Sequence, residues 1–258
     1  MNAYPPVTSD PVRWAIMRQE WNDLAFVHWP VPVDAVQDRL PRGLYADLHD
    51  GHAWVGLVAF HMQRIGAGGL HVPYLGTFPE TNIRTYVRDA AGRPGVWFDS
   101  LDITRLIPTA VARVTYGLPY MWSKMQIRRT GDRRVYECRR RWGGPRATSA
   151  IDIAIGSPIA AEEVTSLERF LTCRWGLYSR AVGRVLYAPV EHPEWPLHRA
   201  QLHRLDDTLS TVAGYPQPEA EPLVHWTPGV EVRIGRPRRV VLAERRALAP
   251  SPAFAPGT

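Results

Sequence analysis

The chain contains the segment Phe78-Pro79-Glu80-Thr81-Asn82-Ile83-Arg84-Thr85-Tyr86-Val87, in which polar residues alternate with β-branched ones. Successive side chains of a strand point to opposite faces, so every second residue from Glu80 to Tyr86 shares one face. The other face carries Thr81, Ile83 and Val87. A charged face on a strand of this kind lines either bulk solvent or a polar cavity. The segment therefore predicts a sheet, and a binding site if that face turns inward.

Further strands are expected at short spacing around this segment. We predict them at 24–29, 53–62, 96–101, 120–129, 135–142, 177–181 and 184–190. Short helices are predicted at 34–40, 107–116 and 160–172. Hairpin turns are expected at 89–95 and 130–132 because both contain glycine and aspartate. Many strands and few helices indicate a mainly β (α+β) fold, a closed antiparallel barrel with short helices at its rim.

The length of 258 residues fits one domain at 13–244, preceded by an N-terminal arm at 1–12. The Ala- and Pro-rich end at 245–258 is expected to be disordered. No apolar run approaches the roughly 18 residues of a membrane span, and no signal peptide is visible. Two cysteines, Cys138 and Cys173, form no disulfide framework. We therefore expect a soluble cytoplasmic protein without a membrane partner.

The net charge of +6 and the pI near 9.6 invite a nucleic-acid interpretation. The arginines of 139–141 would be split between two faces of a strand, and the tail lacks interleaved aromatic residues. We therefore expect solvated arginines and no nucleic-acid partner. His28, His52 and His61 have no metal-ligand spacing, so neither a metal nor a cofactor is expected.

Several short motifs are typical of one family. They are Leu24-x-Phe26-x-His28-Trp29, Leu40-Pro41-x-Gly43-Leu44, Trp54-Val55-Gly56-Leu57, the segment 78–87, Ser100-Leu101-Asp102, Arg113-x-x-Tyr116-Gly117-Leu118-Pro119-Tyr120 and His192-Pro193-x-Trp195-Pro196-Leu197. On these motifs the chain resembles the YqjF-like, or DUF2071, family of uncharacterised bacterial proteins over about 13–240. That family is similar to acetoacetate decarboxylase, which implies a cone-like β-barrel with an internal ligand cavity.

The resemblance also implies that the catalytic lysine of the decarboxylase is missing from this chain. Acetoacetate decarboxylase forms a Schiff base through a lysine in a Gly-aromatic-Pro-Lys-Lys run. The matching run here is Gly117-Leu118-Pro119-Tyr120-Met121, which has no lysine. The decarboxylase reaction is therefore not expected. Tyr120 stands at the position of the catalytic lysine, and Glu80 looks like the counterpart of the decarboxylase glutamate. Lys124 is the only lysine, and it shares a face with Tyr120 only if the strand stays regular.

Two residues are candidates for catalysis, Glu80 as proton shuttle and Tyr120 as hydrogen-bond donor. Arg84 is the candidate anion clamp. The full candidate ligand-binding set is Arg84, Asn82, Tyr86, His28, Trp122, Lys124 and Arg113. The alternative is a buried polar network that only stabilises the barrel, and structural roles are favoured for Asp102 and Arg113.

Two functions of different class remain open at this point. The chain is predicted to be a small-molecule-binding barrel, and it could be an enzyme that acts on a small carbonyl or carboxylate compound by acid–base chemistry. The alternative is a noncatalytic protein that binds or sequesters a ligand. In both cases the ligand is expected to be polar or anionic. A homo-oligomer is compatible with the sequence.

Overall fold

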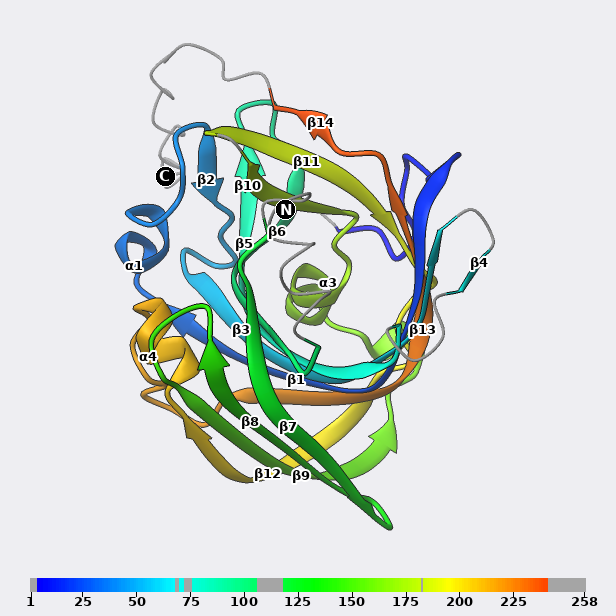
Figure 1. Cartoon of the computed structure of the whole chain (residues 1–258), viewed down its shortest axis with the longest axis vertical. Coiled ribbons are helices and arrows are strands. Elements are labelled where there is room, and N and C mark those ends of the chain that lie inside the picture. Colours follow the sequence, from blue (N-terminus) through cyan, green and yellow to red (C-terminus); the bar gives the residue numbers. More distant parts are fainter. Residues whose placement is uncertain (1–3, 68–69, 72–75, 106–117, 182, 241–258) are drawn as a thin grey trace, which may run out of the picture.

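A computed structural model describes residues 4–67, 70–71, 76–105, 118–181 and 183–240. Within these ranges the strands pair into one continuous sheet (Figure 1). The strands are β1 (Ala15–Val31), β2 (Leu44–Ala46), β3 (Ala53–Ala67), β4 (Leu70–His71), β5 (Phe78–Asp89), β6 (Pro94–Ile103), β7 (Tyr120–Thr130), β8 (Arg133–Trp142), β9 (Thr148–Pro158), β10 (Gly176–Ala181), β11 (Arg184–Glu191), β12 (His198–Asp207), β13 (Leu223–Gly235) and β14 (Arg238–Arg239). The helices are α1 (Val33–Gln37), η1 (Ala161–Glu163), α3 (Ser166–Thr172) and α4 (Leu209–Ala213).

The strand pairings close two rings that share a wall. The first, which we call the seven-strand ring, runs β1, β3, β5, β6, β10, β11, β13 and back to β1. The second, the nine-strand ring, runs from β6 through β7, β8, β9 and β12 to β13 and returns through β1, β3 and β5. The predicted closed barrel is confirmed. Two of its pairings, β6 with β7 and β6 with β10, are parallel.

The shared wall is buried on both faces because each face belongs to a different ring. Val27, Leu57 and Ile83 point into the nine-strand ring, where they form an aliphatic core with Ile151 and Ile153. Strands buried on both faces lose the simple contrast between an apolar and a polar side. This explains why nearly every residue of β5 is buried.

Helix α3 lies inside the outline of the seven-strand ring in Figure 1. Its Phe170 and Leu171 pack against side chains of β5 and β6, including Tyr86 and Leu101. The helix begins with a capping box, in which Thr165 Oγ1 accepts from the Glu168 N–H at 3.2 Å. The sequence predicted one helix over 160–172. Instead, an extended Val164 separates η1 from the shorter α3.

Other segments also differ from the sequence-based predictions. The segment 199–209, which the sequence left ambiguous between helix and strand, forms most of β12 and ends at the first residue of α4. β13 continues through its Pro-Gly pair, where Gly229 has a φ of +124° and lies so close to Trp21 that a Cβ would meet its carbonyl oxygen at 2.0 Å. The predicted helix at 107–116 and the tail at 245–258 lie outside the described residues.

The N-terminal arm is tied to the barrel by named hydrogen bonds. Tyr4 Oη donates to the Asp47 carboxylate, and the Trp175 indole N–H donates to the Pro5 carbonyl at 3.1 Å. The Val12 N–H donates to Glu191 at 2.6 Å. The helices in the described part of the chain are all too short or too polar to cross a membrane.

Candidate functional site

The polar face of β5 turns into the seven-strand ring. Glu80, Asn82 and Arg84 are 3%, 4% and 6% exposed, and Tyr86 is completely buried. Register places Glu80 opposite Phe60 of β3 and the other residues further along the same wall. Of the two interpretations that the alternating pattern left open, the structure therefore supports an interior face rather than a solvent face.

Arg84 is a buried cation without an acidic partner among the described residues. Its Nη2 donates to the Leu171 carbonyl at 3.2 Å and to Tyr86 Oη at 3.4 Å, and its guanidinium lies 5.3 Å from the centre of the Phe26 ring. Its Nε–H has no hydrogen-bond partner in the described residues. Burying a charge without a counter-ion is costly, so this guanidinium has unused capacity for an anion.

Glu80 lies four residues before Arg84 on the same face, about 13 Å away along the strand. Burial raises the pKa of this carboxyl to about 8, the hydrogen bond from Asn82 opposes the shift, and the charge of Asp102 adds to it. Asn82 Nδ2 donates to Glu80 Oε1 at 3.3 Å, while Oε2 has no partner in the described residues. At neutral pH the carboxyl is therefore protonated and can donate through Oε2.

This shift of the Glu80 pKa makes stability depend on pH. The folded protein holds the Glu80 proton up to about pH 8, whereas an unfolded chain releases it near the ordinary value of 4.5. Stability must therefore fall as pH rises between these values. Between about pH 5 and about pH 8, the wild type is expected to lose roughly 3 kcal/mol more unfolding free energy than Glu80→Gln. Urea unfolding at both pH values measures the difference, and parallel losses would contradict the assigned pKa.

His28 and Tyr86 form a hydrogen-bonded pair beside Arg84. The Tyr86 Oη lies 2.6 Å from His28 Nε2. Burial, followed by the charges of Arg84 and His225, lowers the pKa of His28 well below its ordinary value, so the imidazole is neutral. Because Arg84 donates to Tyr86 Oη, the phenol can donate to Nε2, which leaves the proton of His28 on Nδ1. That Nδ1 has no partner in the described residues.

Gly56 makes room for this histidine. It lies opposite His28 on β3, and a Cβ at position 56 would come within 2.9 Å of the His28 Cδ2 atom. Real Cβ contacts are longer, so a side chain at 56 would displace the imidazole. The glycine in the Trp54-Val55-Gly56-Leu57 motif thus has a packing role at the site.

The interior contains an unusual concentration of buried polar atoms without partners. Most buried polar atoms in native proteins make a hydrogen bond, so each exception needs an explanation. Within the described chain, the unpartnered atoms on this interior surface are Glu80 Oε2, Asn82 Oδ1, Arg84 Nε, His28 Nδ1 and His225 Nδ1. In the protonation states derived above, Glu80, Arg84 and His28 present hydrogen-bond donors. Such a set is suited to an oxygen-rich group.

The sequence analysis did not identify one buried pair, Glu168 of α3 and His225 of β13. The Nε2 of His225 lies 2.8 Å from Glu168 Oε1. This hydrogen bond is the main reason that the pKa of Glu168 falls to about 2. The pair fixes the start of α3 to the barrel wall. The Thr165-x-x-Glu168 capping pattern was the available signal in the sequence.

Tyr120 reaches the same interior surface. It pairs with Leu101 of β6, which in turn pairs with Asn82, so the three lie in one row across neighbouring strands. Paired residues present their side chains to the same face. Tyr120 is half-buried and packs against the apolar clusters that contain Ile103 and Phe170.

The structure does not bring Trp122 and Lys124 to this surface. A register shift interrupts the pairing of β7 with β8 between Trp122 and Ser123. Beyond it, Ser123 is buried and Lys124 is exposed, and Trp122 is 36% exposed. The unpaired residue of this bulge is Arg141 of β8, so the alternation of β7 continues and Trp122 and Lys124 lie on its exposed face. Arg113 lies outside the described residues.

Asp102 faces the nine-strand ring and is already paired. Its carboxylate accepts two hydrogen bonds from Arg140, at 2.9 Å and 2.7 Å, and one from Ser123 at 2.6 Å. Its placement agrees with the structural role favoured from the sequence. No group of three or more His, Cys, Asp or Glu side chains in the described ranges could hold a metal ion.

Comparison with known proteins assigns the chain to a family. Residues 18–231 match the model of the DUF2071 family, described as an uncharacterised conserved protein. The chain belongs to the DUF2071 family. It is 35% identical over 212 residues to the uncharacterised protein YqjF of Bacillus subtilis (strain 168), an alignment that covers 82% of this chain and 87% of YqjF. The family resemblance inferred from the sequence motifs is confirmed.

Solved structures with the same fold are enzymes. The enduracididine biosynthesis enzyme MppR, solved with pyruvate, matches with a TM-score of 0.61 at 16% identity, over 86% of this chain and 90% of MppR. An acetoacetate decarboxylase-like enzyme from Sphingomonas wittichii RW1 matches with a TM-score of 0.60 at 14% identity, over 88% and 93% of the two chains. Identities this low establish a common fold and leave function to the site.

Proposed function

We propose that this DUF2071 protein binds a small monocarboxylate inside the seven-strand ring, with the carboxylate at Arg84 and with Glu80 as a neutral hydrogen-bond donor further along the same interior face. The observation that carries the proposal is a buried guanidinium without a counter-ion among the described residues, on the same interior face as a buried carboxyl that is protonated at neutral pH. A carboxylate supplies the missing charge and accepts hydrogen bonds in the geometry that arginine favours.

The charges around Arg84 support a ligand with a single negative charge. Glu80 and His28 are both neutral there because burial shifts their pKa values in opposite directions. Glu168 is hydrogen-bonded to His225, 2.8 Å away, rather than to Arg84. Arg84 is therefore left as one uncompensated positive charge, which a monoanion neutralises and a dianion would exceed.

A carbonyl group on the ligand would use the remaining donors. The Oε2–H of Glu80 and the Nδ1–H of His28 have no hydrogen-bond acceptor among the described residues. MppR has been solved with pyruvate, a small keto acid, which supports pyruvate as the first probe for a barrel of this fold. Without a lysine in the 117–121 run, the proposed binding is noncovalent.

Acid–base catalysis is the second candidate, and one observation favours it. A proton donor works best when its pKa lies near the working pH, and the pKa of Glu80 is raised to about 8. Tyr120 is on the same interior surface and would orient the substrate. Glu80→Gln separates the two functions, because an enzyme would lose turnover while keeping affinity. A binder shows no turnover in either form.

A calorimetric titration of the full chain with pyruvate tests the proposal, with methyl pyruvate as the uncharged control. We expect pyruvate to bind and the ester to bind at least tenfold more weakly. Above about pH 8 the affinity for pyruvate is expected to fall, because an ionised Glu80 repels the carboxylate. Equal affinities for acid and ester would contradict an anion site at Arg84.

A further inference from the structure

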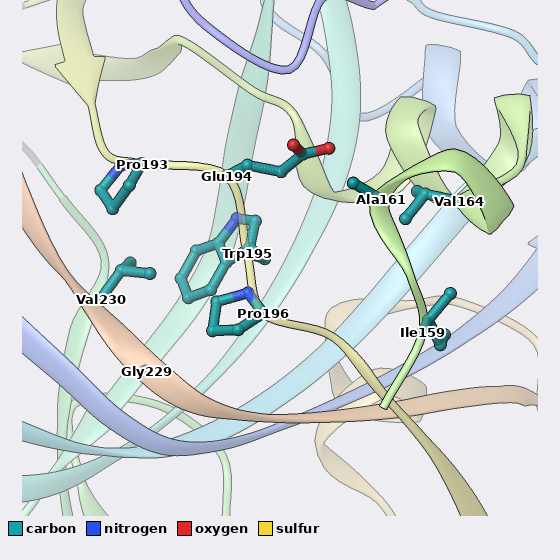
Figure 2. Close-up of a pocket in the computed structure, with 9 residues that line it drawn as sticks. All are labelled: Ile159, Ala161, Val164, Pro193, Glu194, Trp195, Pro196, Gly229 and Val230. Atoms are coloured by element: carbon teal, nitrogen blue, oxygen red, sulfur yellow. The ribbon is translucent and has the colours of Figure 1, made fainter. Parts of the chain in front are cut away.

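A hollow is lined by Trp195, whose ring contacts the Phe26 ring beside Arg84. It has a cavity volume of about 400 Å³ and lies between the segment leading into α3, the connection before β12 and strand β13 (Figure 2). The lining is mainly apolar, with branched, proline and tryptophan side chains. Its residues are Ile159, Ala161, Val164, Pro193, Glu194, Trp195, Pro196, Gly229 and Val230.

Aromatic contacts connect this pocket to Arg84. The Trp195 ring, which belongs to the pocket lining, meets the Phe26 ring edge-on with 5.4 Å between centroids. Phe26 also contacts Arg84, whose guanidinium lies 5.3 Å from the centre of the Phe26 ring. Two ring contacts therefore separate the pocket wall from the unpaired cation.

The C-terminal end of α3 accepts hydrogen bonds from both Trp195 and Arg84. The Trp195 indole N–H donates to the Thr172 carbonyl at 3.1 Å, and Arg84 donates to the neighbouring Leu171 carbonyl at 3.2 Å. The pocket wall and the cation are thus fixed to consecutive residues of one helix. Their relative position is set by the fold rather than by a loop.

The charged side chain of the pocket lining already has an ion-pair partner. Glu194 is the ionisable residue of the lining, and its Oε1 accepts from Arg169 at 2.7 Å. The remaining lining is apolar and is packed against the cluster that contains Trp195, Ile159 and Val230. A pocket of this kind favours a hydrocarbon group over a polar one.

We propose that this pocket receives the aliphatic chain of a monocarboxylate whose carboxylate lies at Arg84. The inference rests on the proposed function and specifies its ligand as a carboxylate with an extended apolar tail, larger than pyruvate. The tail would run from the Arg84 guanidinium past Phe26 and Trp195 into the pocket. The binding energy then comes from the tail, and Arg84 fixes the orientation of the ligand.

Titration of the full chain with acetate, butanoate, hexanoate and octanoate tests this inference. Burial of each methylene is worth about 0.8 kcal/mol, or about fourfold in affinity, so each acid, two methylenes longer than the one before it, is expected to bind about 15-fold more tightly. Ala161→Trp fills the pocket from an exposed lining position, and Ala160→Trp places the same side chain at an exposed neighbour outside the lining.

We expect the two tryptophan substitutions to have different effects on the affinities for acetate and octanoate. Ala161→Trp reduces octanoate affinity to that of acetate and leaves acetate unchanged, while Ala160→Trp affects neither acid. The inference is overturned if affinity does not rise with chain length, or if Ala161→Trp has no effect on octanoate affinity. If short acids still bind in an Arg84-dependent way in that case, the proposed function survives. Octanoate binding that needs the pocket but is insensitive to Arg84→Met would overturn both.

Discussion

Replacing Arg84 with methionine is expected to weaken pyruvate binding roughly 100-fold without lowering the free energy of unfolding. Arg84 is 6% exposed and has no acidic partner in the described residues, so burial of its charge is unfavourable to the fold. Methionine fills a similar volume without a charge. It loses the hydrogen bonds to Leu171 and Tyr86, worth about 1 kcal/mol each, but it also removes the cost of a lone buried charge.

The loss of binding is expected to be roughly 100-fold, because charge-assisted hydrogen bonds contribute up to about 3 kcal/mol. Lys124→Met is the matched control, since it also exchanges a cation for methionine but at an exposed position of β7. It should leave both pyruvate affinity and stability unchanged. If Arg84→Met instead unfolds the protein at much lower urea concentration, the polar face of β5 is a stabilising network and the anion site is refuted.

Asp102→Asn is expected to have the opposite effect, a loss of 3–5 kcal/mol of unfolding free energy, on the order typical of broken buried ion pairs. The Asp102 side chain is fully buried and the Arg140 side chain is 3% exposed. Two hydrogen bonds join them, and Ser123 donates a third to the same carboxylate. An asparagine at 102 leaves the Arg140 charge inside the nine-strand ring without compensation.

Urea unfolding of three variants tests this assignment. Asp102→Asn combined with Arg140→Met should recover a large part of the stability, because no charge is then left unpaired. Glu137→Gln breaks the exposed pair of Glu137 with Arg128 and should change stability by less than about 1 kcal/mol. An Asp102→Asn variant that is as stable as Glu137→Gln would show that Arg140 can find another partner.

The contrast between these two arginines distinguishes a structural ion pair from the proposed ligand site. Both are buried in the walls of the same sheet. Arg140 has a carboxylate partner with good geometry, whereas Arg84 has only a carbonyl and a phenol. A sequence of ordinary stability tolerates an unpaired buried charge where function requires it.

The sequence predicted the alternation of β5 but could not predict which of its faces holds the site. Both faces are buried, because the strand belongs to two rings whose closure depends on pairings between distant segments such as β11 and β13. The same limit applies to α3. Its residues predict a capped helix, but only the closure of the ring places Phe170 and Glu168 against the polar face.

The burial of individual strand faces accounts for the remaining differences. Lys124 keeps the alternation of Tyr120 along β7, but beyond Tyr120 this face of the strand is exposed. Of the arginines at 139–141, which were all expected to be solvated, Arg140 is buried because Tyr136, Cys138 and Arg140 alternate inward along β8. Its partner Asp102 lies on a distant strand, so the pair was not visible in the sequence.

The central claim, that Arg84 is an unpaired cation reserved for a carboxylate, is tested most directly by unfolding wild type and Arg84→Met with and without saturating pyruvate. A ligand that binds only the folded state raises its unfolding free energy by linkage, about 2.7 kcal/mol at 100 times the dissociation constant. We predict this increase for the wild type and only about 0.4 kcal/mol for Arg84→Met, whose ligand-free stability is at least that of the wild type. Equal increases in both proteins, or none in the wild type, would contradict the claim.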